Sequence, residues 1–168
     1  MRAAAKERGE DPDELPRTYA KLINEVIANR PDDLTVGIHL CRGNYRSTWF
    51  AEGGYEPVAE VLFSTINVDA YFLEYDDERS GDFAPLRFVP DNKMVVLGLV
   101  SSKIPTLETQ AELITRIEEA ARYMPLANMG LSPQCGFSST HHGNAMTMDD
   151  QWRKLELVVD TARTVWGD

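Results

Sequence analysis

One short stretch of the sequence combines residue types that bind metal ions. Within residues 37–45, His39 and Cys41 are separated by a single residue and lie where an apolar run at positions 34–40 ends. Residues i and i+2 of a strand point to the same face, so an imidazole and a thiolate could converge there on one ion. Gly43 follows, and glycine permits a tight turn of the backbone. The stretch predicts a pair of metal ligands at the end of a buried strand.

Two further candidate ligands occupy similar positions later in the chain. Glu74 lies near the end of an apolar segment, and Cys135 follows another. Zinc takes four ligands from thiolate, imidazole and carboxylate groups, and two thiolates favour zinc over magnesium or calcium. His39, Cys41, Glu74 and Cys135 would complete such a set. The residues alone leave an alternative open, in which a core histidine lies beside buried free thiols and Glu74 is a surface carboxylate.

The elements that would position these residues alternate along the chain. Apolar periodicity predicts strands at 34–40, 68–75, 94–100 and 128–133, and helices at 16–30, 55–66, 83–89, 107–124 and 148–166. Thr147 is the predicted N-cap of the last helix, with Asp150 as its partner. Residues 1–15 are polar and charged, and we expect a flexible segment there, which leaves 16–168 as the domain. Continuous apolar strands alternating with helices predict an α/β fold with a parallel sheet.

The candidate ligands all follow predicted strands. In parallel α/β folds, ligands bind at the carboxyl ends of the strands. A random scatter of polar residues would have populated the opposite ends as well. This placement therefore predicts a functional site at one edge of the sheet.

Composition narrows the possible partners. The net charge of -10 argues against nucleic-acid binding, which requires clustered Lys and Arg. No apolar run approaches the ~20 residues of a membrane span, and the first ten residues lack the apolar core of a signal peptide. We therefore expect a cytoplasmic protein with no membrane partner. In a reducing compartment, the two cysteines favour metal binding or free thiols over a disulfide.

Three segments occur in the order found in a known enzyme family. They are Ile38-His39-Leu40-Cys41-Arg42-Gly43-Asn44, Val68-Asp69-Ala70-Tyr71-Phe72-Leu73-Glu74-Tyr75 and Leu131-Ser132-Pro133-Gln134-Cys135-Gly136-Phe137. Together they resemble the catalytic barrel of the cobalamin-independent methionine synthases, and most of all its shorter relatives that lack a duplicated N-terminal barrel. The resemblance extends from about Thr18 to the C-terminus. It implies a (β/α)8 TIM-barrel fold and a Zn²⁺ ion bound at the positions of His39, Cys41, Glu74 and Cys135.

The resemblance also implies a reaction. In this family the zinc binds a substrate thiol as a thiolate, which attacks a methyl or other alkyl group. A free thiol with a pKa near ~8.5 is mostly protonated at neutral pH, and bound zinc deprotonates a coordinating thiol. A carboxylate ligand can leave when the thiol arrives, so we expect Glu74 to be the exchangeable ligand. Arg42, Asn44 and Gln134 are predicted to bind substrate, with bracing of a loop as the alternative for each.

Two departures from the family pattern bear on function. A TIM barrel needs eight strands and ~250 residues, whereas four strands are predicted here. The chain therefore resembles the C-terminal half of a barrel, and we expect a fragment, a split-gene product with an N-terminal half-barrel partner, or a half-barrel that pairs with a copy of itself. In addition, the family carries an Ile-His-Ser-Pro type motif, whose His is the acid that helps the folate leave, after the strand that ends here in Val100. This sequence reads Gly98-Leu99-Val100-Ser101-Ser102-Lys103-Ile104-Pro105, and that His has no counterpart. His142 is the candidate substitute for that acid, and a pair of solvated loop histidines with His141 is the alternative.

Three functions follow from these observations. The first is zinc-dependent transfer of a methyl group, with methyltetrahydrofolate as one candidate donor, to a small-molecule thiol such as homocysteine. Transfer to another thiol such as coenzyme M is an alternative, because the epoxyalkane:coenzyme M transferases look similar around the His-x-Cys pair. The second is a non-catalytic half-barrel that acts by pairing with a partner chain. The third, a hydrolytic zinc enzyme, is disfavoured because two thiolates and a carboxylate acidify a bound water poorly.

Overall fold

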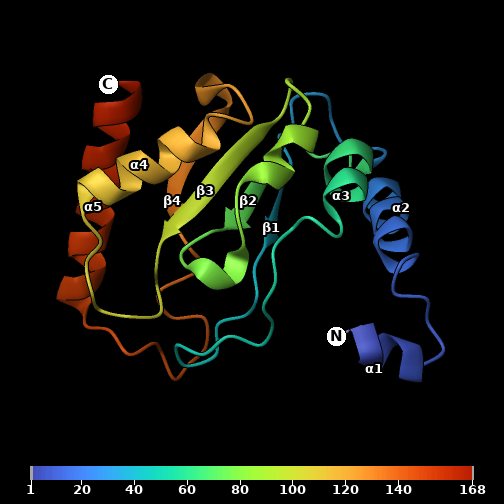
Figure 1. The fold of residues 1–168 in the computed structure, drawn as a ribbon, viewed down its shortest axis with the longest axis horizontal. Helices are drawn as coiled ribbons and strands as arrows, with labels where there is room; N and C mark the ends of the chain where they lie inside the picture. Colours follow the sequence, from blue (N-terminus) through green and yellow to red (C-terminus); the bar gives the residue numbers. More distant parts are fainter. Residues whose placement is uncertain (1, 168) are drawn as a thin grey trace.

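Four parallel strands form one sheet in which the spatial order follows the chain order (Figure 1). The computed structural model describes residues 2–167. The strands are β1 (Gly37–Leu40), β2 (Ala70–Glu74), β3 (Met94–Val100) and β4 (Met129–Pro133). Helical segments connect them, as parallel neighbours require. The predicted α/β fold is confirmed: the chain supplies about four βα units of the TIM-barrel type.

The helices lie on both flanks of this sheet. They are α1 (Arg2–Glu7), α2 (Leu15–Ile27), α3 (Ala59–Thr65), α4 (Gln110–Ala120) and α5 (Met148–Trp166), with short 3₁₀ segments η1 (Glu78–Ser80), η2 (Ala84–Phe88) and η3 (Leu126–Asn128). Helices α4 and α5 pack together beside β3 and β4, while α2 and α3 pack together on the β1 side (Figure 1). None of the helices within residues 2–167 combines the length and apolarity needed to cross a membrane.

Several predicted boundaries are wrong by a few residues, for identifiable reasons. β1 begins at Gly37 because the Val36 N–H donates to the Asp69 carboxylate, 2.7 Å away, instead of to a strand partner. α4 begins at Gln110 because Thr109 is its N-cap and forms a capping box with Glu112. The predicted helix at 83–89 is the 3₁₀ segment η2. The predicted capping box of Thr147 and Asp150 on α5 is confirmed.

The N-terminal segment contains secondary structure. Residues 2–7 form α1, and the side chain of Ala5 is 3% exposed. A short helix at positions 1–15 therefore occurs where a flexible segment was predicted, and the division into a segment and a domain at residue 16 stays a prediction.

The two faces of the sheet differ in burial. Tyr71, Leu73 and Leu97 point to one face and are fully buried in the core beneath the helices. The opposite face carries His39, Phe72 and Met94, and the last two are 39% and 45% exposed. Each large apolar side chain buried in this core contributes about 1.5–3 kcal/mol to folding. The exposed apolar face is the one that would line the interior of a complete barrel.

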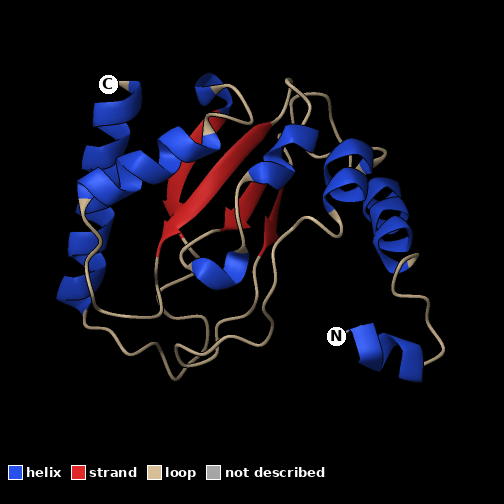
Figure 2. Cartoon of the chain, in the orientation of Figure 1, coloured by secondary structure: helices blue, strands red, loops and turns tan. Residues whose placement is uncertain are grey.

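The carboxyl ends of the strands point to the same edge of the sheet. In Figure 2 the arrowheads lie along this edge, and long loops follow them. The register explains the alignment: Leu40 pairs with Leu73 and Glu74 pairs with Gly98. Cys41, the residue after Leu40, is therefore level with Glu74 on the neighbouring strand.

Candidate metal centre

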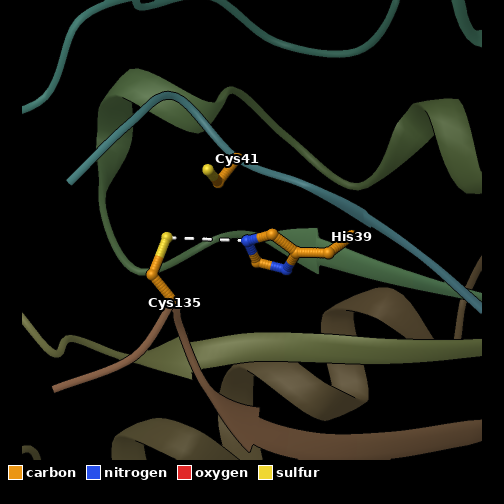
Figure 3. A group of neighbouring side chains, drawn as sticks. All are labelled: His39, Cys41 and Cys135. Atoms are coloured by element: carbon orange, nitrogen blue, oxygen red, sulfur yellow. Dashed lines mark hydrogen bonds between the residues drawn. The ribbon is translucent and has the colours of Figure 1, made fainter. Parts of the chain in front are cut away.

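Three potential metal ligands converge at the carboxyl edge of the sheet. One ligand atom from each of His39, Cys41 and Cys135 lies within 4.8 Å of the other two. The Nε2 atom of His39 is 3.6 Å from the Sγ atom of Cys135 (Figure 3). His39 comes from β1, Cys41 follows the end of that strand, and Cys135 follows β4. The structure thus brings together three of the four predicted metal ligands.

Each sulfur of the cluster accepts a hydrogen bond from a neighbouring group. The Gly43 N–H donates to Cys41 Sγ over 3.4 Å, and the Gln134 amide donates to Cys135 Sγ over 2.7 Å. Among the protein groups alone, burial and then the neighbouring Cys41 together raise the pKa of Cys135 to about 12. A divalent cation between the sulfurs would reverse this effect, because it favours the deprotonated thiol. Two sulfurs and one imidazole nitrogen at this spacing fit zinc.

Glu74 lies beside this cluster and is bound to other groups. With His39 and Cys135 it lines a cavity of about 300 Å³. Its Oε2 atom accepts from the Arg42 N–H at 2.5 Å, and its Oε1 atom accepts from Arg79 at 3.0 Å and Lys103 at 3.5 Å. The carboxylate is not among the three groups that converge, so its role as a metal ligand stays a prediction.

Sequence reasoning missed the buried charged network behind Glu74. A run of charged residues such as 76–79 is usually a solvated loop, yet the side chains of Asp76 and Arg79 are 1% and 8% exposed. Asp76 contacts Arg79 at 3.1 Å and Lys103 at 3.3 Å. Lys103 also donates to Gln134 Oε1 at 2.5 Å. The available signal was the position of Lys103 just after β3, at the same edge as the other site residues.

The three predicted substrate-binding residues occupy different environments. The Arg42 guanidinium donates to the Gly53 and Glu74 carbonyls and stacks on Tyr55 at 4.1 Å, so it braces the loop. Asn44 donates to the Gly136 carbonyl at 3.2 Å, and its buried Oδ1 atom has no hydrogen-bond partner within the described residues. Gln134 is 1% exposed, between Lys103 and Cys135. Substrate contacts by these side chains stay predictions.

His142 lies on an exposed loop. The ring centroids of His142 and Tyr45 are 5.8 Å apart in an edge-on arrangement, and those of His142 and His141 are 3.8 Å apart. These contacts fit the alternative of paired loop histidines, and a catalytic role for His142 stays a prediction.

Comparison with known proteins identifies the family. Residues 17–163 match the family profile described as "Cobalamin-independent synthase, Catalytic domain". The chain belongs to this family. The implied resemblance to cobalamin-independent methionine synthases is thereby confirmed.

Individual relatives agree with the assignment to the cobalamin-independent synthase family. The chain is 52% identical to YxjH of Bacillus subtilis over 98% of its own length and 44% of that protein. It is 55% identical to YxjG of the same organism over 94% of its length and 42% of that protein. It is 24% identical to a methionine synthase of Pyrococcus abyssi over 71% of its length and 36% of that protein.

Solved structures share the fold. A Listeria monocytogenes protein described as a candidate vitamin-B12-independent methionine synthase matches 95% of this chain with a TM-score of 0.73 and 38% identity. A B12-independent methionine synthase from a Shewanella species, solved with selenomethionine, matches 91% with a TM-score of 0.71 and 18% identity. Each match covers 44% of the solved chain. The chain thus spans less than half the length of these relatives.

Proposed function

We propose that this chain provides the metal-binding half of a zinc-dependent methyltransferase that methylates a thiol such as homocysteine. The observation that carries the proposal is the convergence of His39, Cys41 and Cys135 within 4.8 Å at the carboxyl edge of the sheet. The family assignment supports it, as does the Pyrococcus relative named methionine synthase. The Shewanella structure contains selenomethionine, an analogue of the methylated product.

His39, Cys41 and Cys135 would hold the zinc ion, with Glu74 as the exchangeable fourth ligand. Bound zinc supplies one function, which is to stabilise the substrate thiol as a thiolate at neutral pH. The Gly43 N–H and the Gln134 amide fix the two protein sulfurs, and the cavity of about 300 Å³ beside them provides room for a small substrate.

The transfer itself is a displacement at carbon. The substrate sulfur forms a bond to the methyl carbon while the bond between that carbon and the donor breaks. The electron pair of the broken bond stays with the donor, which then takes up a proton. We assign the delivery of that proton to His142, whose ring contacts Tyr45, four positions after Cys41 in the chain.

The remainder of the barrel would come from a second half. The chain covers 42–44% of its Bacillus relatives, and one face of its sheet exposes Phe72 and Met94. Within residues 2–167, β1 and β4 each pair with one neighbour, which leaves two open strand edges. Four further strands, from an N-terminal half-barrel or from a second copy, would cover this face and complete the substrate pocket. A non-catalytic role through such pairing is the second candidate, favoured by the same exposed face.

Mass and metal content measured on one sample test the proposal. Light scattering and zinc analysis of the purified chain would be followed by methyl-transfer assays with homocysteine, and with coenzyme M as a second thiol. We expect about one zinc per chain and methylation of homocysteine once both barrel halves are present. Stoichiometric zinc with no transfer to either thiol from the completed barrel would favour the non-catalytic role. Absence of zinc binding after metal loading would contradict the zinc site itself.

A further inference from the structure

We propose that Lys103 is a positioning residue that, together with Arg79, draws the Glu74 carboxylate away from the metal and so keeps one metal position available to the incoming thiol. We call Lys103, Arg79 and the Arg42 N–H the Glu74 clamp. This inference rests on the proposed zinc site and deepens it, because it identifies which residues make Glu74 exchangeable.

The clamp occupies both oxygens of the Glu74 carboxylate. Oε1 accepts from Arg79 Nη2 at 3.0 Å and from Lys103 Nζ at 3.5 Å, while Oε2 accepts from the Arg42 N–H at 2.5 Å. Hydrogen bonds in which both partners carry charge are roughly twice as strong as neutral ones. To bind a metal ion, the carboxylate must give up at least part of this set.

Burial strengthens the clamp. The Glu74 side chain is 0% exposed, that of Lys103 is 3% exposed, and that of Arg79 is 8% exposed. Charges in such an environment interact more strongly than charges in water, and salt screens them much less. Asp76 forms ion pairs with both Arg79 and Lys103. The two cations therefore keep a carboxylate partner when Glu74 moves.

Lys103 also connects Glu74 with the sulfur side of the site. Its Nζ atom donates to Gln134 Oε1, and the Gln134 amide donates to Cys135 Sγ over 2.7 Å. A continuous chain of side chains therefore runs from Glu74 through Lys103 and Gln134 to Cys135. Zinc sites that bind substrate have three protein ligands and one open position. His39, Cys41 and Cys135 provide the three ligands, and the clamp keeps Glu74 from permanently filling the fourth position.

A double-mutant cycle with cobalt tests this inference. Co²⁺ is used in place of zinc on the full chain, because its absorption spectrum reports the ligands directly. The variants are Glu74→Gln, Lys103→Met and the two combined. We expect Lys103→Met to bind Co²⁺ about tenfold more tightly and, in the completed barrel, to bind homocysteine about tenfold more weakly, since Glu74 then stays on the metal. The loss of Co²⁺ affinity caused by Glu74→Gln should be at least tenfold larger in the Lys103→Met background than in the wild type.

Further variants serve as controls for charge, for folding and for the metal site itself. Lys103→Arg keeps the positive charge and should restore wild-type Co²⁺ and homocysteine affinities. Lys103→Gln removes the charge but keeps a hydrogen-bonding group, and serves if Lys103→Met does not fold. Equal effects of Glu74→Gln in both backgrounds would overturn the clamp while leaving the metal site intact. If the Cys41→Ser variant instead has the same Co²⁺ absorption spectrum as the wild type, the proposed zinc site is overturned, and the clamp with it.

Discussion

The Nε2 atom of His39 lies 3.6 Å from the Sγ atom of Cys135, although 96 positions separate the two residues in the chain. His39 is on β1 and Cys135 follows β4, which are the two outer strands of the sheet. Neighbouring strands are ~4.8 Å apart, so the outer strands of a flat four-stranded sheet would be ~14 Å apart. The short distance therefore reflects inward curvature of the sheet and its loops, as in a barrel.

Replacement of any member of the cluster should abolish tight zinc binding. We expect His39→Asn or Cys135→Ser to lower zinc affinity by about 100-fold or more, because loss of outer hydrogen-bonding partners alone costs 10–100-fold. Competition with a chromophoric chelator measures this affinity. His141→Asn is the matched control, since His141 is an exposed loop histidine outside the cluster. Retention of zinc by the His39 variant would remove imidazole from the ligand set.

Gly98 is required where β3 passes the site. A Cβ atom at this position would lie 2.8 Å from the backbone oxygen of Leu73 and 3.4 Å from Gln134 Cα. The backbone cannot yield without disturbing the pairing of β2 with β3, so we expect Gly98→Ala to lower the free energy of unfolding by about 1–3 kcal/mol. Urea unfolding followed by circular dichroism measures the change.

Gly130→Ala is the control for this substitution. Gly130 lies in the adjacent strand β4, and an added Cβ would make only ordinary contacts at 3.8 Å with Val96. It should change stability by less than half as much as Gly98→Ala. Equal losses for the two variants would mean that any side chain on this face of the sheet is disruptive.

The exposed face of the sheet should mediate pairing with the second half of the barrel. Phe72 is 39% exposed at the centre of this face, and a charge there would have to be buried on pairing. We therefore expect Phe72→Glu to weaken association at least tenfold, measured by sedimentation velocity with a second copy or with the N-terminal portion of a relative. Phe50→Glu is the control, because Phe50 is 83% exposed on a loop. Similar effects of both changes would point to non-specific contacts.

The sequence predicts most of the scaffold because its signals are local. The strand Met94–Val100 and the capping box of Thr147 and Asp150 match their predictions, since an apolar run and a Thr-x-x-Asp pattern determine them within a few residues. The late start of α4 could also have been predicted, because Thr109 and Glu112 show the same local pattern.

The site was less predictable because its contacts join distant positions. Local sequence does not show that Cys135 meets His39: the residue types and the strand-end placement made the four-ligand set one of two open interpretations, and the resemblance to a family favoured it. The buried state of Asp76 depends on Lys103, 27 positions away. A charged segment is solvated unless a partner of opposite charge is buried with it, and that partner is visible only in the folded chain.

The N-terminus of α5 offers a local test of stability. The Thr147 side chain accepts from the Asp150 N–H, and the Asp150 carboxylate accepts from the Thr147 N–H at 2.9 Å. Removal of an N-cap hydroxyl costs about 1 kcal/mol. We expect Thr147→Ala to lower the free energy of unfolding by about this amount in urea titrations. Thr140→Ala, in a loop between β4 and α5, serves as a threonine control that leaves the cap intact.

The same cap predicts a pH dependence. The Thr147 hydroxyl and N–H, followed by Arg153, hold the pKa of the Asp150 carboxyl below its usual range. A carboxyl with a depressed folded pKa stabilises the fold above its unfolded pKa of about 3.9, and this stabilisation is lost as the pH falls through the folded pKa. The stability difference between the wild type and Asp150→Asn should therefore be full at pH 6 and shrink below about pH 4. Asp149→Asn, in the same helical turn, leaves the capping box intact and should show a smaller difference at pH 6. A wild-type advantage over Asp150→Asn that is unchanged down to pH 3 would show that the charge of Asp150 does not stabilise the cap.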